Sequence, residues 1–262
     1  MSVFSRLVVT TLPLVPKFLV GRVARPYVAG ETLDDAVDVV RTLNNEGAMA
    51  TLDVLGEEVT HRDKAIASVE EYVRLYEAIE KHHLDANVSV KPTMLGLKID
   101  EDFCLDNTAM IADCAARYGN FLRLDMEDRT CTDATLRIYR QLQDRYGNVG
   151  CVLQAYMRRT LDDIGDLPED GANVRLCKGI YIEPRATAWK GFNTNRLNFL
   201  RALEKMFERD VYAGIATHDE YLVCGAAAMI DRMGISRDRY EFQMLHGVDL
   251  SLIHISEPTR LQ

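Results

Sequence analysis

The chain has 262 residues and is 47% hydrophobic, so it can bury one large core, and a single domain is expected. Its 40 acidic and 31 basic residues give a formal net charge of −9, which excludes a chain-wide basic surface for nucleic acid. The six cysteines show neither CxxC spacing nor pairing with histidine, so we expect reduced, buried thiols and no metal site.

Residues 1–30 differ in composition from the rest. Their basic residues alternate with apolar runs and precede the first acidic residue; they are Arg6, Lys17, Arg22 and Arg25. Such a segment fits an extension packed on the domain, an organelle presequence or a membrane-surface helix. Pro13 and Pro16 weaken both helical alternatives, which favours a packed extension. No apolar run reaches the length of a membrane span.

Helices and strands are expected to alternate from residue 32 onward. Thr32 should cap a helix that runs to Gly47, because Asp34 and Asp35 fill its first turn. A strand over residues 49–55, a helix over 62–82 and a strand over 88–92 follow from the apolar periodicity.

The tetrapeptide Arg-Tyr-Gly-Asn occurs twice, at residues 117–120 and 145–148. In both places we expect the glycine to take the left-handed conformation that ends a helix. Each copy leads into an apolar stretch, FLRLDM at 121–126 and CVLQAY at 151–156. The repeat therefore predicts successive βα units.

Three further strands are expected over residues 174–181, 211–217 and 240–245, with helices over 197–207 and 221–233. Seven strands alternating with helices favour a parallel barrel over a doubly wound sheet. The absence of a GxGxxG motif after the first strand also counts against a dinucleotide-binding domain of the Rossmann type.

Residues 250–262 break this pattern where an eighth strand and a closing helix are due. The stretch from Leu250 to Arg260, LSLIHISEPTR, matches a translated transposase sequencing adapter, so we interpret the segment as a sequencing artefact. The domain is then an incomplete barrel over residues 31–249. Open edges on its first and seventh strands would make the chain fold poorly or lack activity.

Polar residues gather where the expected strands end, which is the rim that carries the active site in parallel barrels. They are Asp53, Glu57, Lys91, Asp125, Glu127, Gln154, Tyr156, Lys178, Thr217, His218 and His246. Simpler interpretations exist: Lys91 as a solvated loop lysine, and Thr217 and His218 as helix caps. Arg175, in the strand that precedes Gly179, suits an anionic cofactor or is merely a basic strand end.

These residues leave two enzyme classes open. A rim lysine beside an acid could form a Schiff base, as in barrel aldolases. Alternatively, several cations together with Gln154 and Thr217 could hold a flavin nucleotide. A non-catalytic barrel fragment is a third alternative.

Seven motifs together resemble the proline dehydrogenase family: LDVLGEEV, VSVKPTMLG, LRLDMED, VLQAYMRRT, VRLCKGIY, ATHDEYL and YEFQMLHG. They occur in the family's order from about Tyr27 to Val248. The resemblance implies an α/β fold, a distorted (βα)8 TIM barrel, that binds FAD non-covalently. It also implies oxidation of L-proline to 1-pyrroline-5-carboxylate, with electrons passed to a membrane quinone.

The resemblance also assigns roles by position. Asp125 and Arg175 would be catalytic, with Arg175 beside the reacting flavin nitrogen. Lys91 would meet the proline carboxylate, and Tyr181 and Leu245 would shape the substrate pocket. The residues that would contact FAD are Met126, Gln154, Cys177, Lys178, Gly179, Thr217 and His218.

The sequence departs from the family at its end. Proline dehydrogenases carry a tyrosine and paired arginines there that clamp the substrate carboxylate, whereas residues 250–262 offer no such set. Glu57 would then lack an ionic partner, and Lys91 would face the carboxylate alone. We expect a cytoplasmic bacterial protein, with peripheral contact at the inner membrane as a further expectation and a mitochondrial location less favoured.

Overall fold

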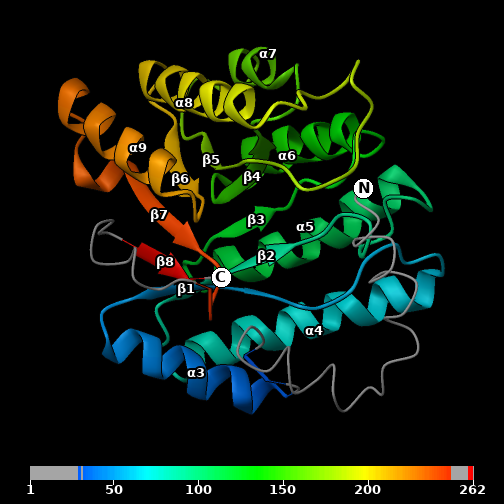
Figure 1. Ribbon diagram of the computed structural model, residues 1–262. Helices are drawn as coiled ribbons and strands as arrows, with labels where there is room; N and C mark the ends of the chain where they lie inside the picture. The colour runs from blue at the N-terminus through cyan, green and yellow to red at the C-terminus, as the bar shows by residue number, and fades with distance from the viewer. Residues whose placement is uncertain (1–28, 31, 249–258, 262) are drawn as a thin grey trace, which may run out of the picture.

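The computed structural model describes residues 29–30, 32–248 and 259–261, and its strands form one closed parallel barrel. Figure 1 shows the strands at the centre, with helices wrapped around them. In chain order the strands are β1 (Met49–Asp53), β2 (Ala86–Val90), β3 (Leu122–Leu124), β4 (Val149–Gln154), β5 (Asn173–Cys177), β6 (Tyr212–Ala216), β7 (Tyr240–Met244) and β8 (Thr259–Leu261). The helices are α3 (Leu33–Asn45), α4 (Arg62–Lys81), α5 (Glu101–Arg117), α6 (Thr132–Tyr146), α7 (Thr160–Gly165), α8 (Phe192–Glu208) and α9 (Glu220–Met233), with a 3-10 turn, η3 (Arg237–Arg239), before β7.

The barrel and its first seven strands confirm the fold expected from the sequence. The prediction of open edges on β1 and β7 is wrong, because β8 pairs with both strands. Only three residues form β8, and they lie within the segment interpreted as foreign to the barrel. A strand this short is enough for closure because backbone hydrogen bonding does not depend on side-chain identity. No helix follows β7 in the part of the chain that the structure describes.

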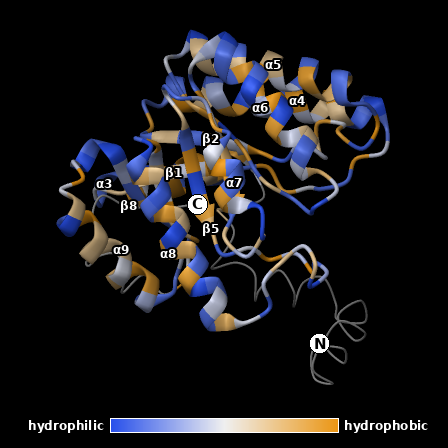
Figure 2. Ribbon diagram, turned by 90° about the horizontal axis from the view of Figure 1, so that it is seen from above, coloured by the Kyte–Doolittle hydropathy of each residue, from blue (hydrophilic) through white to orange (hydrophobic). Residues whose placement is uncertain are grey.

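The strands present apolar side chains to the helices. Buried residues of this outer face join one hydrophobic core with the helices, among them Val88, Val90, Leu122, Leu124, Leu153, Leu176 and Ile215. The helices in turn bury one apolar face each, and Figure 2 shows hydrophobic and hydrophilic segments alternating along their ribbons. Burial of this interface is the main force that holds the barrel together.

The inner face of the barrel is polar, which the sequence reading did not anticipate. Side chains alternate between the two faces of a strand, so the residues between those of the outer face point inward. The buried inner residues include Thr51, Asn87, Ser89, Arg123, Arg175, Glu241 and Gln243. They bond one another across strands, as when Thr51 Oγ1 donates to Asn87 Oδ1 at 2.7 Å. The polar surface of the rim therefore continues into the interior of the barrel.

Local signals fix several helix ends as expected. Thr32 and Asp35 form a capping box at the start of α3. Gly119 and Gly147, in the two Arg-Tyr-Gly-Asn repeats, have φ of +62° and +73°, so the left-handed helix ends are confirmed. Thr217 and His218 do not cap α9, whose N-cap residue is Asp219.

All six cysteines are free, and four of them are buried. Among the described residues, no helix is long and apolar enough to cross a bilayer. The expectation for residues 1–30 concerns a segment that lies almost entirely outside the described residues.

Candidate functional site

The centre of the rim is a buried contact between Arg175 and Asp125. Arg175 Nη1 donates to Asp125 Oδ1 at 2.9 Å, and Ser89 Oγ donates to the same oxygen at 2.6 Å. Only 4% of Arg175 is exposed, and its buried Nη2 has no hydrogen-bond partner in the part of the chain that the structure describes. A buried guanidinium N–H without an acceptor is costly, so this atom suits a ligand acceptor.

The other side of Arg175 is held by β7. Its Nε donates to Gln243 Oε1, and Gln243 Nε2 donates in turn to Glu241 Oε1. Gln243 and Glu241 are both 2% exposed. The chain of contacts thus crosses the barrel interior from β7 through β5 to the end of β3.

A second charged pair lies after β1 and β2. The Lys91 ammonium bonds the Asp53 carboxylate, and Tyr72 OH donates to Asp53 Oδ1 at 3.2 Å. Burial, reinforced by the negative charge of Asp125, raises the pKa of Asp53 to about 6. Burial opposes the charged form of Lys91, but the attraction of Asp53 outweighs it and raises the lysine pKa. Lys91 is therefore a firmly charged ammonium that does not stand alone at the rim.

A third acid, Glu127, joins neighbouring loops. It accepts from the Thr93 backbone N at 2.9 Å and from Thr93 Oγ1 at 2.5 Å. Its backbone oxygen accepts from Gln154 Nε2 at 2.8 Å. The amide nitrogen of Gln154, expected to await a ligand, is thus already bonded within the protein. Burial raises the pKa of Glu127.

Two cations share one carboxylate at the ends of β5 and β6. Arg196 binds Asp219 with two hydrogen bonds of 2.9 and 2.6 Å, and Lys178 Nζ lies 3.2 Å from Asp219 Oδ2. The Arg196 guanidinium also lies 4.2 Å from the ring centroid of Phe192. The bonds from Arg196 hold the pKa of Asp219 below its usual value. The group keeps one surplus positive charge, which favours an anionic ligand.

Thr217 and His218 lie beside this group but already have protein partners. Thr217 Oγ1 accepts from Asp219 N at 3.1 Å, and His218 Nε2 contacts the backbone N of Leu245 at 2.8 Å. Asp219 is the N-cap residue of α9, but its side chain makes no capping hydrogen bond and binds Arg196 and Lys178 instead. The neighbouring cations remain the stronger anion-binding groups.

Gly179 has a steric reason to be glycine. Its φ is +97°, and a Cβ would lie 2.2 Å from the Tyr156 ring. Tyr156 OH donates to the backbone oxygen of Tyr181 at 3.1 Å, which holds the loop after β5 over this ring. Burial raises the pKa of Cys177, at the end of the same strand, to about 11, so its thiol stays protonated.

Apolar side chains stand around the polar centre. Leu245 is 54% exposed after β7, and Ile180 and Ile182 are more than 80% exposed after β5. Met126, by contrast, is buried. Leu245 is therefore available as a pocket wall, as the resemblance implied, whereas Met126 would offer its backbone more readily than its side chain.

The structure brings Asp125 and Arg175, the two residues expected to be catalytic, into contact, while their catalytic roles stay a prediction. It also collects Lys178, Thr217 and His218 at the adjoining strand ends. Residues that were not selected are Ser89, Glu241 and Gln243, which belong to the Arg175 network, and Arg196, which binds Asp219. The strand alternation of inward and outward residues could have revealed the three on β2 and β7, because each lies two residues from another inward position.

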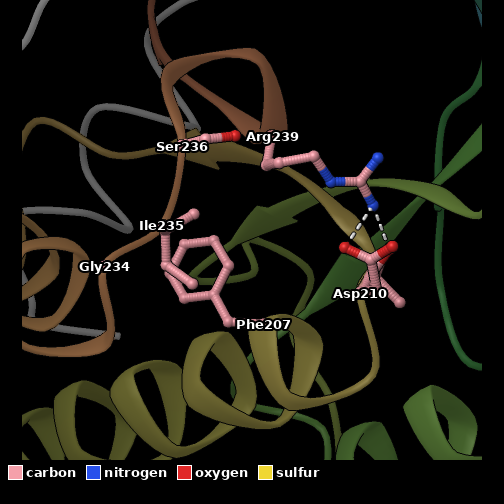
Figure 3. Close-up of a pocket in the computed structure, with 7 residues that line it drawn as sticks. Phe207, Asp210, Gly234, Ile235, Ser236 and Arg239 are labelled. Atoms are coloured by element: carbon pink, nitrogen blue, oxygen red, sulfur yellow. Dashed lines mark hydrogen bonds and ion pairs between the residues drawn. The ribbon is translucent and has the colours of Figure 1, made fainter.

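A concave pocket on the described surface lies away from this rim. Phe207, Ile235 and an ion pair between Asp210 and Arg239 line it, as Figure 3 shows. These residues precede β6 and β7, so the pocket lies at the amino ends of the strands. Conserved chemistry in parallel barrels is built at the opposite, carboxyl ends, and we do not assign the reaction to this pocket.

Comparison with known proteins decides the family. The family model described as "Proline dehydrogenase" matches residues 36–254. The chain belongs to the proline dehydrogenase family. It is an oxidoreductase of the proline dehydrogenase class, as the resemblance in its motifs predicted.

Curated relatives agree with this assignment. Proline dehydrogenase 1 of Bacillus subtilis is 34% identical over 225 residues, a span that covers 86% of this chain and 74% of the relative. The proline dehydrogenase of Deinococcus radiodurans is 34% identical over 230 residues, with the same coverage.

Solved structures confirm the barrel. Proline utilization A from Bdellovibrio bacteriovorus superimposes with a TM-score of 0.82 at 21% identity, over 91% of this chain. The protein of the same name from Bradyrhizobium japonicum gives 0.74 at 19% identity, over 92% of this chain. The chain spans 30% and 29% of those two longer proteins. At such identities the likeness speaks for the fold alone.

Proposed function

We propose that this proline dehydrogenase binds FAD non-covalently and oxidises L-proline to 1-pyrroline-5-carboxylate, passing the electrons to a membrane quinone. The observation that carries the proposal is the Arg175 guanidinium, which Asp125 holds in place and whose buried Nη2 has no hydrogen-bond partner among the described residues. A flavin ring presents acceptor atoms along its edge, so it matches this donor.

The donor set at the rim fits a dinucleotide. Lys178 and Arg196 carry one charge more than Asp219 neutralises, which suits the diphosphate group. Thr217 and His218 would line the same part of the site. Gln154 and the backbone of Met126 and Cys177 would approach the flavin from β3, β4 and β5. Gly179 would let the loop after β5 fold over the cofactor.

Bound FAD would supply the capacity to accept two electrons from the ring carbon next to the proline nitrogen. Arg175 would stabilise the negative charge that develops during this transfer, and Asp125 would hold Arg175 in place. Lys91, kept protonated by Asp53, would attract the proline carboxylate. Tyr181 and Leu245 would exclude water from the apolar ring and fix its distance, since such transfers depend on close geometry.

A Schiff-base aldolase is disfavoured by the state of Lys91. That chemistry needs a neutral amine, usually reached by a lowered lysine pKa. Here the pairing with Asp53 raises the pKa instead. The rim lysine is therefore suited to binding an anion and unsuited to attacking a carbonyl.

Anaerobic titration tests the proposal. The purified chain, supplied with FAD, should retain the flavin through gel filtration, and L-proline should bleach its absorbance while 1-pyrroline-5-carboxylate accumulates. D-proline and a lysine-to-glutamine variant at the exposed Lys190 serve as negative and positive controls. Retained flavin that L-proline leaves oxidised would contradict the proposal.

The electron acceptor and membrane contact need a separate experiment. We propose that residues 1–30 contact the membrane surface that holds the quinone, because their charge is basic and their runs are apolar. The full chain and a chain lacking residues 1–26 would be sedimented with anionic vesicles that contain a quinone. Equal sedimentation of the two chains would contradict a membrane role for residues 1–26. A quinone that stays oxidised when L-proline is added would contradict its role as electron acceptor.

The domain boundaries are tested at the DNA level. We propose that residues 31–249 are the native part of the barrel and that residues 250–262, although they contain β8, come from an adapter. Amplifying the locus from the source sample and reading past the codon for Asp249 distinguishes a longer frame from the printed one.

A further inference from the structure

We infer that Gln243 is a positioning residue for Arg175, and that Glu241 sets the orientation of the Gln243 amide. The inference rests on the proposed function, in which Arg175 lies against the flavin. The residue pair is on β7, outside the set that the sequence assigned to catalysis or cofactor binding. Gln243 Oε1 accepts from Arg175 Nε, and Gln243 Nε2 donates to Glu241 Oε1.

The chemistry of the three groups allows only one orientation of the amide. A guanidinium offers donors and no acceptor, and the Glu241 oxygen that meets Gln243 accepts a hydrogen bond. Gln243 lies between them, so its oxygen must face Arg175 and its nitrogen must face Glu241. Turning the amide over would oppose donor to donor and acceptor to acceptor. Glu241 thus selects the face of Gln243 that Arg175 meets.

Glycine on the intervening strand provides the space for this contact. Gly214 is in register with Arg175 on β5 and with Glu241 on β7. A Cβ at Gly214 would lie 2.9 Å from Gln243 Nε2 and 3.4 Å from the Arg175 Cα. Any side chain there would push the amide away from the guanidinium. The space for Gln243 is therefore built into the neighbouring strand.

The contacts fix the plane of the guanidinium from two directions. Nε is held by Gln243, and Nη1 is held by Asp125 at 2.9 Å and by Ser89 at 3.3 Å. A planar group fixed at two of its nitrogens cannot rotate, so the direction of the third is determined. That third nitrogen, Nη2, is the buried atom without a partner. Gln243 acts by aiming Nη2 at the ligand.

The test compares two buried glutamines. Gln243→Met removes the acceptor for Arg175 at similar volume. Gln143→Met is the matched control, since Gln143 is also buried and makes two hydrogen bonds, to Gly171 O and from Val149 N, near the amino end of β4. Both variants should lose comparable thermal stability. Only Gln243→Met should change the properties of the bound flavin.

The decisive readout is the midpoint potential of FAD bound to the full chain, with the FAD dissociation constant measured alongside. We expect Gln243→Met to lower the ratio of affinities for reduced over oxidised FAD about tenfold, because a charge-assisted contact is weakened. For a two-electron couple this lowers the potential by about 30 mV. Gly214→Ala, which displaces Gln243 without removing a polar group, should shift the potential in the same direction.

The possible outcomes distinguish a failure of this inference from a failure of the proposed function. Potentials equal to that of the wild type in both Gln243→Met and Gly214→Ala would overturn the inference and leave the proposed function standing. A shift as large in Gln143→Met would also overturn it, because the effect would then report general loosening. A wild-type chain that binds no FAD would overturn the proposed function and the inference together. If Gln243→Met does not fold, the comparison of Gly214→Ala with wild type decides.

Discussion

Arg175 and Asp125 meet at 2.9 Å although 50 residues and one whole strand separate them. Arg175 lies within β5 and Asp125 directly follows β3, so the contact passes over β4 on the inside of the barrel. This arrangement places a buried positive charge at the rim and neutralises it from one side only. Gln243 holds Nε on the other side, so among the described residues Nη2 is the nitrogen left for a ligand.

Replacing this arginine should damage both binding and chemistry. Arg175→Met removes the buried cation that pairs with Asp125 and leaves that half-buried carboxylate with the Ser89 hydroxyl, which costs about 3 kcal/mol of unfolding free energy. Flavin reduction by L-proline should slow by at least about 100-fold. Stopped-flow absorbance and urea unfolding measure the two effects. Unchanged bleaching by proline would refute the role of Arg175.

The Asp53 pair predicts a pH dependence of stability. The pKa of Asp53 is raised from 3.8 to about 6 in the folded protein, so the folded state holds a proton that the unfolded state releases. The favourable contribution of this carboxyl is complete below about pH 4 and is lost as the pH rises to about 6. Two pKa units correspond to an upper limit of about 3 kcal/mol.

Asp53→Asn should flatten this dependence. Urea unfolding at half-unit steps from pH 4 to pH 7 would compare the variant with wild type and with Asp63→Asn, a change at an exposed position of α4. We expect the wild-type and Asp63→Asn curves to run parallel. A slope in Asp53→Asn equal to theirs would show that another group titrates in this range.

Gly179→Ala should be far more harmful than an ordinary glycine substitution. The new Cβ would collide with the Tyr156 ring at 2.2 Å, and the backbone φ of +97° disfavours any side chain. We expect a loss of about 3 kcal/mol or a displaced loop with weaker FAD binding.

Gly147→Ala is the control that measures the cost of the backbone conformation alone. It has φ of +73° and no atom within 4 Å of the added Cβ, so about 1 kcal/mol is expected. Thermal unfolding and FAD titration of both variants separate collision from conformational strain. Equal effects at the two positions would argue against a tight loop over Tyr156.

Thr93→Val should show how strongly the Thr93 hydroxyl stabilises the charged carboxylate of Glu127. The change removes the hydroxyl that donates to the buried carboxylate, at a cost of about 1–3 kcal/mol. The hydrogen bond from this hydroxyl lowers the Glu127 pKa against the effect of burial, so its loss raises the pKa further, while the backbone N–H bond remains. The destabilisation should therefore be larger at pH 8 than at pH 4, where the carboxyl is protonated in both proteins.

Thr108→Val provides the comparison. Thr108 is equally buried, but its hydroxyl donates to a backbone oxygen of its own helix at 2.7 Å and contacts no acid. Its effect on unfolding free energy should be smaller and independent of pH. A pH-independent loss in Thr93→Val would place the deprotonation of Glu127 outside this range.

Much of the fold could be read from the sequence because its signals are local. Apolar strands, the capping box at Thr32 and the glycines of the repeated tetrapeptide each depend on neighbouring residues. The edge prediction failed because pairing by β8 needs only backbone groups, and the letters of residues 259–261 do not reveal a strand.

The sequence predicted where the site lies, but it predicted only some of the side-chain contacts within it. Strand ends identify the rim and Asp125 on it, whereas the resemblance to a family was needed to select Asp125 and Arg175 as catalytic residues. The pairing of Lys91 with Asp53, and that of Arg175 with Gln243, joins residues 38 and 68 positions apart. Such contacts depend on barrel closure and register, which the apolar periodicity of single strands does not encode.

The polar interior of the barrel also bears on how the protein can change over generations. Replacing a buried ionic network with well-packed apolar residues is often neutral or stabilising by 1–4 kcal/mol. Selection for heat resistance alone would thus favour the substitution of Arg175, Asp125 and Gln243 by apolar residues before it favoured changes in the outer core. Persistence of this network in a population would be a sign that catalysis, and not folding, is being selected.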